Sequence, residues 1–310
     1  MSDNLVSIIM SCYNEKIEWI KDSIESILNQ TYRNIEFIIV CDNPKNTDLV
    51  KVLKNYEMID SRIKLIINKK NLGLTNSLNT ALLHATGRYI ARMDADDICL
   101  LNRIELETEY LKKNKLDIVM SNAFFIDENE NVFFNTKSNK INEKKIKKIL
   151  KYYNPSIHPT WLFRKEILDK LYNYNDISYA EDYDFLCRAV LNDYKIGLIE
   201  EPLIKYRVRN NGITKSKRIY QEINSQRISK EYKKALKNHG IYNIQNELNN
   251  MSKDKISGIL EEDKTFKECK EMFYKKEYIK FIFKIIKVLI KSEIKRNQIF
   301  NYIMYNIVKL

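Results

Sequence analysis

The amino-acid sequence predicts an α/β fold with a mostly parallel sheet flanked by helices, followed by a helical C-terminal region. Short apolar runs alternate with longer segments of helical periodicity in the first third of the chain, and this alternation is typical of a parallel sheet with helices on both faces. The chain has 310 residues, of which 44% are hydrophobic, so it can bury the core of one large domain with an appendage. From Arg218 onward the sequence has helical character throughout, which predicts a separate helical region.

The early strands are predicted from short apolar segments at regular distances along the chain. They are expected at residues 6–12, 35–41, 63–67 and 88–93. The second is almost entirely apolar, as expected for a strand that is covered on both faces. Helices are expected between these strands, at residues 17–29, 47–56 and 72–85. Gly87 follows the last of these helices closely enough to cap its C-terminus.

The pattern becomes less regular in the middle of the chain, where both kinds of element still occur. Helices are expected at residues 104–113, 141–152 and 181–191, and strands at 117–126, 132–135 and 196–199. The strand at 132–135 can pair with 117–126, because an acidic turn joins them. We place the boundary near residue 215, with an α/β domain over residues 1–215 and a helical, basic region over residues 216–310.

A cluster of three carboxylates follows the fourth predicted strand directly: Asp94, Asp96 and Asp97. In an open α/β sheet, ligands bind at the C-terminal ends of the strands. Acids so close together repel one another unless a cation offsets their charge. Carboxylates prefer hard cations such as Mg²⁺ or Mn²⁺, which in turn hold phosphate oxygens. The cluster therefore predicts a site for a metal-bound diphosphate, with a solvated acidic turn as the alternative.

The first two strands also end in polar residues. The first runs into the segment 11–15, which contains Ser11, Tyr13 and Glu15, and the second runs into Asp42. The first strand has no G-x-G-x-x-G after it, and the chain has no G-x-x-x-x-G-K-[ST]. Dinucleotide enzymes and P-loop phosphoryl-transfer enzymes are therefore disfavoured, and a metal on Asp96 is expected to serve as the phosphate clamp.

Several motifs of this chain, in this order, resemble those of family 2 glycosyltransferases, which have the GT-A fold. The first reads Ser-Ile-Ile-Met-Ser-Cys-Tyr-Asn-Glu at residues 7–15, and another reads Gly-Arg-Tyr-Ile-Ala-Arg-Met-Asp-Ala-Asp-Asp at residues 87–97. Further matches lie at residues 71–74, 78–81, 154–160 and 180–185. The resemblance covers roughly residues 5–215, and its specificity comes from the shared order of the motifs.

The resemblance implies an inverting, metal-dependent glycosyltransferase with Mn²⁺ or Mg²⁺ as cofactor. Such an enzyme moves a hexose or N-acetylhexosamine from a UDP-sugar to a hydroxyl of its acceptor, here a growing, lipid-linked bacterial surface glycan. The bacterial origin is inferred from the heavy use of Lys, Ile and Asn, which indicates an AT-rich genome. A metal-dependent nucleotidyltransferase acting on a sugar phosphate is the alternative, and it would release pyrophosphate in place of UDP.

Individual residues receive roles from the same resemblance. Asp42 resembles the acid that hydrogen-bonds the uracil ring. Asp94 resembles the first acid of the DXD motif, near the ribose and donor sugar, and Asp96 resembles the metal-binding acid, with Asp94 as a second ligand. Asp182 resembles the base that deprotonates the acceptor hydroxyl, and His158 lies in a segment on the acceptor side. The other side chains that we assign to the donor site are Ser11, Tyr13, Glu15, Asn71 and Asn76.

The proposed base and its neighbour Glu181 begin a predicted helix. The helix dipole favours ionised acids at that end, and an ionised carboxylate is the form that can accept a proton. Glu181 is therefore the second candidate for the base. Ordinary helix capping is the alternative explanation for both acids.

The chain departs from the family's pattern at two places. The second strand ends Cys-Asp-Asn-Pro at residues 41–44, where Asp-Asp-Gly-Ser is usual. Many relatives carry a histidine shortly after a Tyr-Arg pair, where this chain has Arg209. Because arginine binds phosphate bidentately and stays charged, we expect Arg209 to contact the diphosphate directly.

The net charge of +12 lies almost entirely in the C-terminal third, which has 22 Lys and Arg against 11 Asp and Glu from residue 215 onward. Six lysines recur there at helical spacing, which places them on one face: Lys276, Lys280, Lys284, Lys287, Lys291 and Lys295. An amphipathic helix on an anionic membrane surface is one interpretation, and a core helix with a solvated lysine face is the other. Nucleic acid is not an expected partner, since this charge lies away from the acidic cluster.

Cysteine usage and hydropathy indicate the compartment. The five cysteines show no C-x-x-C spacing, which argues against zinc sites and disulfide bonds. The sequence has no recognisable signal peptide and no long uncharged apolar run of the kind that spans a membrane. We therefore expect a cytoplasmic enzyme, peripheral on the inner face of the cell membrane if the lysine face binds lipid.

Overall fold

The computed structural model describes residues 4–136, 142–209, 217–238 and 278–309, together with scattered residues between 242 and 272. The chain divides into two compact units. The first comprises Met1–Lys147, Pro155–Asp176 and Asp184–Asn210, and the second comprises Lys148–Asn154, Ile177–Tyr183 and Asn211–Leu310. The predicted boundary near residue 215 falls outside the described residues, so the division into 1–215 and 216–310 stays a prediction.

The first unit begins as a parallel sheet, as the sequence predicts. Its strands lie in the order β3-β2-β1-β4, and neighbouring strands are parallel. Their bounds are β1 Val6–Cys12, β2 Ile35–Cys41, β3 Ile63–Ile67 and β4 Tyr89–Asp94. Because parallel strands end at the same edge of a sheet, the polar residues that follow β1, β2 and β4 come to one edge.

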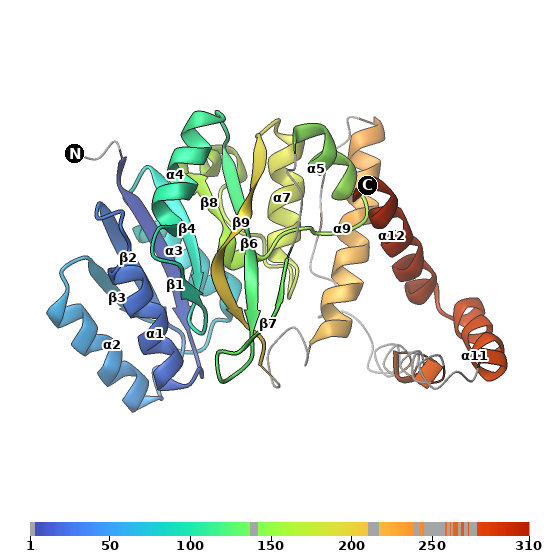
Figure 1. The fold of residues 1–310 in the computed structure, drawn as a ribbon, viewed down its shortest axis with the longest axis horizontal. Coiled ribbons are helices and arrows are strands. Elements are labelled where there is room, and N and C mark those ends of the chain that lie inside the picture. The colour runs from blue at the N-terminus through green and yellow to red at the C-terminus, as the bar shows by residue number, and fades with distance from the viewer. Residues whose placement is uncertain are drawn as a thin grey trace. The chain divides into compact units, whose positions relative to one another are not determined.

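Helices cover both faces of this sheet, with α1 and α2 in front of it and α3 behind it in Figure 1. Their bounds are α1 Ile17–Leu28, α2 Thr47–Ile59 and α3 Leu74–His84. Ile20 of α1 and Leu49 of α2 share a core cluster with Ile8 of β1. α3 packs on β1 and β2 and buries Leu78 and Ala81. Burial on both faces explains why these strands read as continuous apolar runs.

Beyond β4 the sheet is mixed and continues in the order β4-β8-β6-β9-β5. The bounds are β5 Ile98–Cys99, β6 Ile118–Ile126, β7 Val132–Asn135, β8 Leu162–Arg164 and β9 Ile196–Arg207. β8 is antiparallel to both β4 and β6, whereas β6 and β9 are parallel. β7 pairs with β6 in antiparallel fashion, which confirms the predicted hairpin.

Two short strands were missed in the sequence, and a third was predicted too short. β5 and β8 have two and three residues, which is too few for a detectable period. The prediction for β9 stops at residue 199, because Glu200 and Glu201 are exposed and interrupt the apolar pattern. The register against β6 shifts near this point, as it does at a β-bulge. The strand then continues to Arg207 and so reaches the edge where the acidic cluster lies.

Gly87 is not the helix cap that the sequence predicts. α3 ends at His84, and its C-cap residue Ala85 is extended. Gly87 instead lies against β1, where a Cβ atom would come within 2.7 Å of the Leu5 carbonyl oxygen and 2.8 Å of the Ser7 nitrogen. Glycine is required here because the two backbone segments approach too closely for a side chain.

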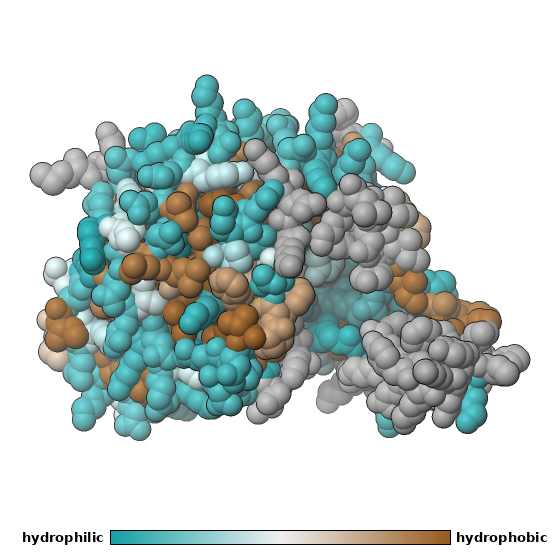
Figure 2. All heavy atoms as spheres, in the orientation of Figure 1, coloured by the Kyte–Doolittle hydropathy of each residue, from teal (hydrophilic) through white to brown (hydrophobic). Residues whose placement is uncertain are grey.

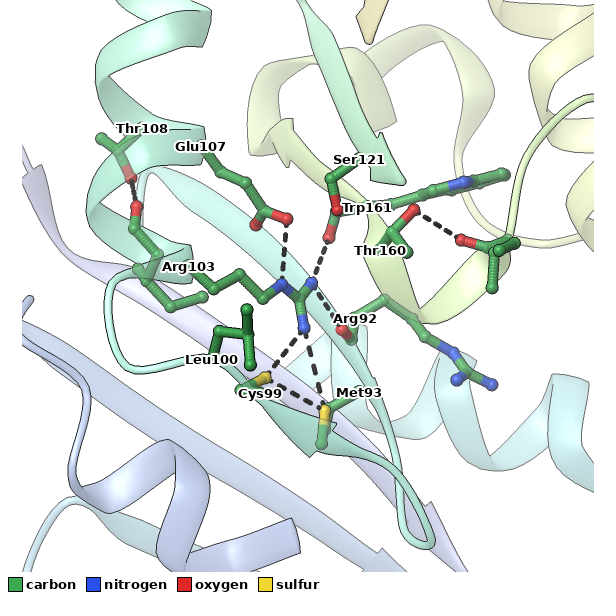
Figure 3. Close-up of polar contacts among 12 residues, drawn as sticks. Arg92, Met93, Cys99, Leu100, Arg103, Glu107, Thr108, Ser121, Thr160 and Trp161 are labelled. Carbon is green, nitrogen blue, oxygen red and sulfur yellow. Dashed lines mark hydrogen bonds and ion pairs between the residues drawn. The ribbon is translucent and has the colours of Figure 1, made fainter. Parts of the chain in front are cut away.

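A buried polar network ties α4 (Arg103–Lys113) to the sheet, as Figure 3 shows. Arg103 is fully buried, and its Nε donates to Glu107 Oε1 at 2.9 Å. Its Nη2 donates to the carbonyl oxygen of Arg92 at 3.0 Å and to that of Trp161 at 3.3 Å. Its Nη1 donates to the Cys99 sulfur at 3.1 Å. The network fixes the backbone of β4 immediately before the acidic cluster.

On the face shown in Figure 2, the coloured residues are mostly hydrophilic, with apolar areas between the polar side chains. On β7, Val132, Phe133 and Phe134 are each more than half exposed. The Phe134 ring packs edge-on against the Phe125 ring, with 5.5 Å between their centroids. The centroids of the Phe125 and Tyr206 rings are 5.2 Å apart. The β6–β7 hairpin therefore carries an aromatic area at the surface of the first unit.

The second unit is helical in most of its described residues after 217, as predicted. Its long helices are α9 Arg218–Asn238, α11 Tyr278–Lys291 and α12 Glu293–Lys309. The shorter helices of the chain are α5 Glu143–Ile149, η2 His158–Thr160, η3 Lys165–Ile167, α6 Leu168–Leu171 and α7 Glu181–Leu191. In the part of the chain that is described, no helix has both the length and the apolarity needed to cross a membrane.

The predicted lysine face is not continuous, because Ser292 separates α11 from α12. Lys295 lies in α12 and is buried, with its Nζ 2.8 Å from Asp263 Oδ1 and 3.2 Å from Glu222 Oε2. The placement of Lys295 on a lipid-facing or solvated stripe is therefore wrong. Its spacing fits the stripe, but two carboxylates from other segments stabilise its charge inside the unit.

The remaining lysines of the stripe differ in their surroundings. Lys284 pairs with Glu268, with 2.6 Å between Nζ and Oε2, whereas Lys280 is exposed. Lys276 lies outside the described residues, and Lys287 and Lys291 are described only as part of the α11 backbone.

Candidate functional site

The acidic cluster lies where β4 leaves the sheet. The carbonyl oxygen of Asp94 accepts hydrogen bonds from the Asp97 N–H at 3.4 Å and from the Ser23 hydroxyl at 2.9 Å. The three carboxylates differ in exposure, since 28% of the Asp94 side chain is exposed against 9% of Asp96, and Asp97 is buried. Asp94 is thus the most accessible of the three to a ligand.

Two of these acids form ion pairs with arginines of the same unit. Arg92 Nη1 lies 2.5 Å from Asp94 Oδ1, and Arg209 Nε lies 2.7 Å from Asp96 Oδ2. Arg92 comes from β4 itself, and its guanidinium points away from the Arg103 network in Figure 3. The arginines therefore offset part of the negative charge of the cluster.

Arg207, at the end of β9, supports the turn from the other side. Its backbone N–H donates to Asp97 Oδ1 at 2.8 Å, and its Nε donates to the Asp96 carbonyl oxygen at 2.8 Å. Arg92 and Arg207 received no role from the sequence. A signal existed for Arg92, because it is a charged residue inside an otherwise apolar strand.

Burial and mutual repulsion both disfavour the ionised form of two acids in the cluster. Burial, together with the nearby Asp94 carboxylate, raises the pKa of Asp96 to about 7. Burial and the charges of Asp96 and Asp94 raise the pKa of Asp97 well above its ordinary value. One oxygen of Asp97 is also buried without a hydrogen-bond partner. A hard cation fits this donor set, because it would favour the ionised form of these acids.

The described residues supply fewer metal ligands than a closed protein site needs. No three His, Cys, Asp or Glu side chains among them are placed to hold a metal ion together. A cation at Asp96 and Asp94 would therefore need further oxygen atoms from a bound ligand. This is the usual situation of Mg²⁺ that is bound through one or two carboxylates and the phosphates of a substrate.

Asp42 organises the loop that leads into α3. Its Oδ1 accepts hydrogen bonds from Asn68 Nδ2 at 2.7 Å and from the Leu72 N–H at 2.8 Å, and its Oδ2 accepts from the Gly73 N–H at 2.9 Å. Gly73 has a positive φ of 83°, which favours glycine. Asn71 Oδ1 accepts from the same Gly73 N–H at 2.9 Å. The predicted uracil ligand Asp42 is thus buried and rigidly held.

Asn76 and Asn71, both predicted donor-site residues, are exposed at the start of α3. Asn76 Nδ2 donates to the Leu72 carbonyl oxygen at 2.9 Å. Both asparagines therefore stabilise the loop that Asp42 holds, and both keep part of their surface open to a ligand.

Arg209 connects the residues that follow β1 to the acidic cluster, because it pairs with both Glu15 and Asp96. Ser11 is the register partner of Asp94 in the β1–β4 pair. Glu15 Oε2 accepts a hydrogen bond from the Tyr13 N–H at 2.7 Å, and Glu15 Oε1 lies 3.7 Å from Arg209 Nη1. The fold thus brings the predicted donor-site residues of β1 to the same edge as Asp94 and Asp96.

His158 is packed in an aromatic environment of the first unit. Its Nε2 lies 3.0 Å from the Tyr174 hydroxyl, and the centroids of the His158 and Trp161 rings are 4.6 Å apart. Burial, with a smaller contribution from the Arg92 charge, lowers the pKa of His158 well below its ordinary value. The imidazole is therefore neutral near pH 7, and its assignment to the acceptor side stays a prediction.

Glu181 and Asp182 belong to the second unit, at the start of α7. Asp182 Oδ2 accepts a hydrogen bond from Asn154 Nδ2 at 2.8 Å, and its Oδ1 accepts from the Tyr183 N–H at 2.7 Å. Asp182 is half-buried and Glu181 is buried. The Asp182 carboxylate is thus held in a fixed orientation by Asn154, the first residue of the motif at residues 154–160.

The sequence model described as glycosyl transferase family 2 matches residues 7–172 of this chain. The chain belongs to glycosyl transferase family 2. This confirms the resemblance that its motifs indicate, and with it the assignment of the protein as a glycosyltransferase. The matched region contains the C-terminal ends of β1, β2 and β4, and it ends before α7 and β9.

Two curated relatives each align with about two thirds of this chain. An uncharacterized glycosyltransferase of Methanocaldococcus jannaschii is 43% identical over 211 residues, covering 68% of this chain and 73% of the relative. The Escherichia coli enzyme WfgD, named UDP-Glc:alpha-D-GlcNAc-diphosphoundecaprenol beta-1,3-glucosyltransferase, is 34% identical over 219 residues, covering 70% of this chain and 82% of the relative. Both alignments cover more than two thirds of this chain and of the relative.

Solved structures confirm the fold class. S. aureus TarS in complex with UDP-GlcNAc has a TM-score of 0.56 at 18% identity, over 68% of this chain and 60% of that one. The mannosyltransferase PcManGT of Pyrobaculum calidifontis, in complex with GDP-Man and Mn²⁺, has a TM-score of 0.54 at 18% identity, over 70% of this chain and 60% of that one. The predicted GT-A-like α/β fold is thereby confirmed, and this chain spans less than two thirds of both solved chains.

Proposed function

We propose that this glycosyltransferase is an inverting, metal-dependent enzyme that uses a UDP-sugar. It moves a hexose or N-acetylhexosamine to a hydroxyl of a growing bacterial surface glycan on a lipid carrier. The observation that carries the proposal is the acidic cluster at the edge of the sheet. Asp42 and Arg209 lie at the same edge. The relative WfgD supports the choice of donor and acceptor, because its name gives UDP-Glc and a diphosphoundecaprenol-linked sugar.

The donor is proposed to lie along the C-terminal edge of β1, β2 and β4. Asp42 and the loop that it holds would receive the uracil, and Asp94 would face the ribose and donor sugar. Ser11, Tyr13, Glu15, Asn71 and Asn76 are the other side chains proposed for the donor site. This order follows the strand order β2-β1-β4, so the nucleotide would cross the sheet edge from base to diphosphate.

The diphosphate is proposed to lie at Asp96, Asp94 and Arg209. Departure of UDP leaves negative charge on the diphosphate, so transfer needs positive charge there. A Mn²⁺ or Mg²⁺ ion held by Asp96 and Asp94 would supply that charge as a Lewis acid. Arg209 can add bidentate hydrogen bonds to phosphate oxygens and stays charged at any working pH.

Asp182 is proposed to take the proton of the acceptor hydroxyl, with Glu181 as the second candidate. An inverting transfer is a single displacement at the anomeric carbon, so the hydroxyl must become nucleophilic as it attacks. The hydrogen bond from Asn154 orients the Asp182 carboxylate, and an ionised carboxylate is the form that accepts a proton. His158 is proposed for the acceptor side, where a neutral imidazole can share a hydrogen bond with a sugar hydroxyl.

The second unit is proposed to bring the enzyme to the inner face of an anionic membrane. Lys280 is exposed, and so are Ile286 and Ile290, which follow one another by one turn of α11. Exposed cations and exposed apolar side chains on one helix are the combination that binds anionic lipid surfaces. Binding to the membrane would bring the enzyme close to its lipid-linked acceptor.

A panel of nucleotide-sugars tests the proposed function. Purified protein is incubated with Mn²⁺ and each UDP-, GDP- or dTDP-sugar, and release of the corresponding nucleoside diphosphate and thermal stabilisation are measured. We expect at least one UDP-sugar to stabilise the protein and to release UDP when acceptor is added. Stabilisation by a non-uridine donor alone would contradict the UDP assignment, and release of pyrophosphate would identify a nucleotidyltransferase.

A further inference from the structure

The ion pair between Arg209 and Asp96 occupies the carboxylate that is proposed to hold the metal. Arg209 Nε lies 2.7 Å from Asp96 Oδ2, and Asp96 is the less exposed partner, with 9% of its side chain open against 25% of Arg209. Arg209 Nη1 also lies 3.7 Å from Glu15 Oε1. The guanidinium is thus held between two carboxylates of the first unit.

A divalent cation and this arginine compete for the same charge. A cation that approached Asp96 with Arg209 in place would meet a positive group at short range, in surroundings that screen charge poorly. It would also have to replace a charge-assisted hydrogen bond, which is among the stronger kinds. The free protein is therefore built to keep a cation off Asp96.

The diphosphate of a donor removes this conflict. It brings negative charge and oxygen acceptors, to which an arginine can donate two parallel hydrogen bonds. Arg209 can then leave Asp96 for the diphosphate, and the Asp96 carboxylate becomes available to a cation. Positive charges that exclude each other in the free protein are both favourable once the diphosphate lies between them.

We propose that Arg209 is the resident counter-ion of Asp96 in the nucleotide-free enzyme and transfers its ion pair to the diphosphate when the donor binds. This inference rests on the proposed function and deepens it. It makes metal and donor binding mutually dependent, since each ligand increases the affinity for the other through the same arginine.

Arg209 is suited to this exchange and the neighbouring arginines are not. Arg92 and Arg207 are almost fully buried. Arg207 is fixed by hydrogen bonds to the backbone of Asp96 and to Asp97, and Arg92 lies within the strand β4. Arg209 lies beyond the end of β9 and is partly exposed, so its guanidinium can change partner without opening the core.

The test measures Mn²⁺ binding by the electron paramagnetic resonance signal of free Mn²⁺, with and without UDP. In wild type we expect weak binding of Mn²⁺ alone and a clear increase in affinity when UDP is present. In R209Q we expect Mn²⁺ alone to bind about tenfold more tightly and UDP, titrated in the presence of Mn²⁺, to bind more weakly. These opposite changes fall within the usual range of coupling between two sites, about 5–150-fold.

Two controls separate this exchange from a general effect of losing an arginine. R62Q removes an arginine of matched exposure, 26%, that pairs with Asp60 at the same distance of 2.7 Å, and we expect it to behave as wild type. The gain in Mn²⁺ affinity should disappear in the double variant D96N/R209Q, because the gain requires the Asp96 carboxylate. R209K keeps the positive charge, so it should bind Mn²⁺ about as tightly as wild type does. It replaces R209Q in the test if R209Q does not fold.

The outcomes for the two proposals differ. If R209Q and wild type bind Mn²⁺ alone equally well, or if R209Q binds it more weakly, the counter-ion role of Arg209 is overturned. If wild type shows no UDP binding in Mn²⁺, the proposed UDP-dependent function fails, whatever R209Q does with the metal alone.

Discussion

Asp96 is the residue on which the proposed metal chemistry depends most directly. We predict that Asp96→Asn lowers the rate of sugar transfer by at least about 10²-fold, because a neutral amide holds a cation poorly and the leaving diphosphate keeps its charge. EDTA should have the same effect on the wild type. The measurement is UDP release with the preferred donor.

Asp60→Asn is the matched control, since Asp60 also pairs with an arginine at 2.7 Å but lies away from the acidic edge. Its activity should stay near wild type. Full activity of the wild type in EDTA would show that Arg209 and the other arginines suffice without a metal.

Asp182 is predicted to act on the rate and not on donor affinity. Asp182→Asn should leave the dissociation constant of the UDP-sugar unchanged and lower kcat by at least about 10²-fold, because a general base typically contributes about 10²–10⁴. Steady-state kinetics and a separate donor titration measure the two quantities. If the variant loses donor affinity and keeps kcat, Glu181 becomes the candidate for the base.

His158 is predicted to make stability depend on pH in a defined direction. Its pKa is lowered by burial in the folded state, whereas it is near 6.5 in the unfolded chain. Below about pH 6.5 the unfolded state therefore binds a proton that the folded state does not, so the contribution to stability is lost as pH falls. Above that pH both states carry the neutral ring and the dependence ends.

Urea unfolding of wild type and His158→Gln at pH 7.5 and pH 5 measures this effect. Wild type should lose more stability than the variant between the two values, by up to about 1.4 kcal/mol for each pH unit below 6.5. Comparison with the variant cancels the buried acids, which titrate in both proteins. An equal loss in the two proteins would mean that His158 takes up a proton while folded.

At the scale of single elements, Arg103 of α4 forms an ion pair with Glu107 of the same helix, and both side chains are fully buried. Removing one partner leaves the other charge buried without compensation. We predict that Arg103→Met lowers the free energy of unfolding by about 3–5 kcal/mol. The measurement is urea denaturation at pH 7.5.

The double variant Arg103→Met/Glu107→Leu supplies the control for this prediction. It should recover part of the lost stability, because the unpaired carboxylate is gone. The recovery stays partial, since Arg103 also donates to the backbone of Arg92 and Trp161 (Figure 3). A double variant no more stable than the single one would show that these backbone hydrogen bonds carry the effect.

At the scale of the whole molecule, the basic helices are predicted to direct the protein to membranes. Replacing Lys280, Lys284, Lys287 and Lys291 of α11 by Gln should weaken co-sedimentation with vesicles that contain anionic lipid. Each lysine near such a surface contributes about 1 kcal/mol, screened over about 8 Å at physiological salt. The contribution of Lys284 should be the smaller one, because it already pairs with Glu268.

Replacement of four lysines of α5 removes the same charge elsewhere and serves as control: Lys144, Lys145, Lys147 and Lys148. This variant should sediment as wild type does. Transfer to a soluble acceptor should stay the same in both variants. Equal sedimentation of the α11 variant and wild type would leave the lysines of α11 as a solvated face.

Much of the first unit could be predicted from the sequence, because its signals are local. β1, β2 and β3 have the predicted bounds. For β1 and β2 the reason is that a strand buried on both faces leaves a continuous apolar run. The acidic cluster was found for a similar reason, because charged residues directly after such a run are visible without any partner. β8 was missed because three residues form a strand only when β4 and β6 lie on either side of it.

The sequence by itself thus determined most of the strands and helices, the family and the acids at the edge of the sheet. Only the tertiary structure decided which charges meet: Arg209 on Asp96, Arg92 on Asp94, and Lys295 inside the second unit against Asp263. It also decided that Gly87 serves a close approach of two backbones and not a helix cap. The physical reason is that periodicity and burial leave traces within one segment, whereas an ion pair depends on segments that are distant in the chain and adjacent only after folding.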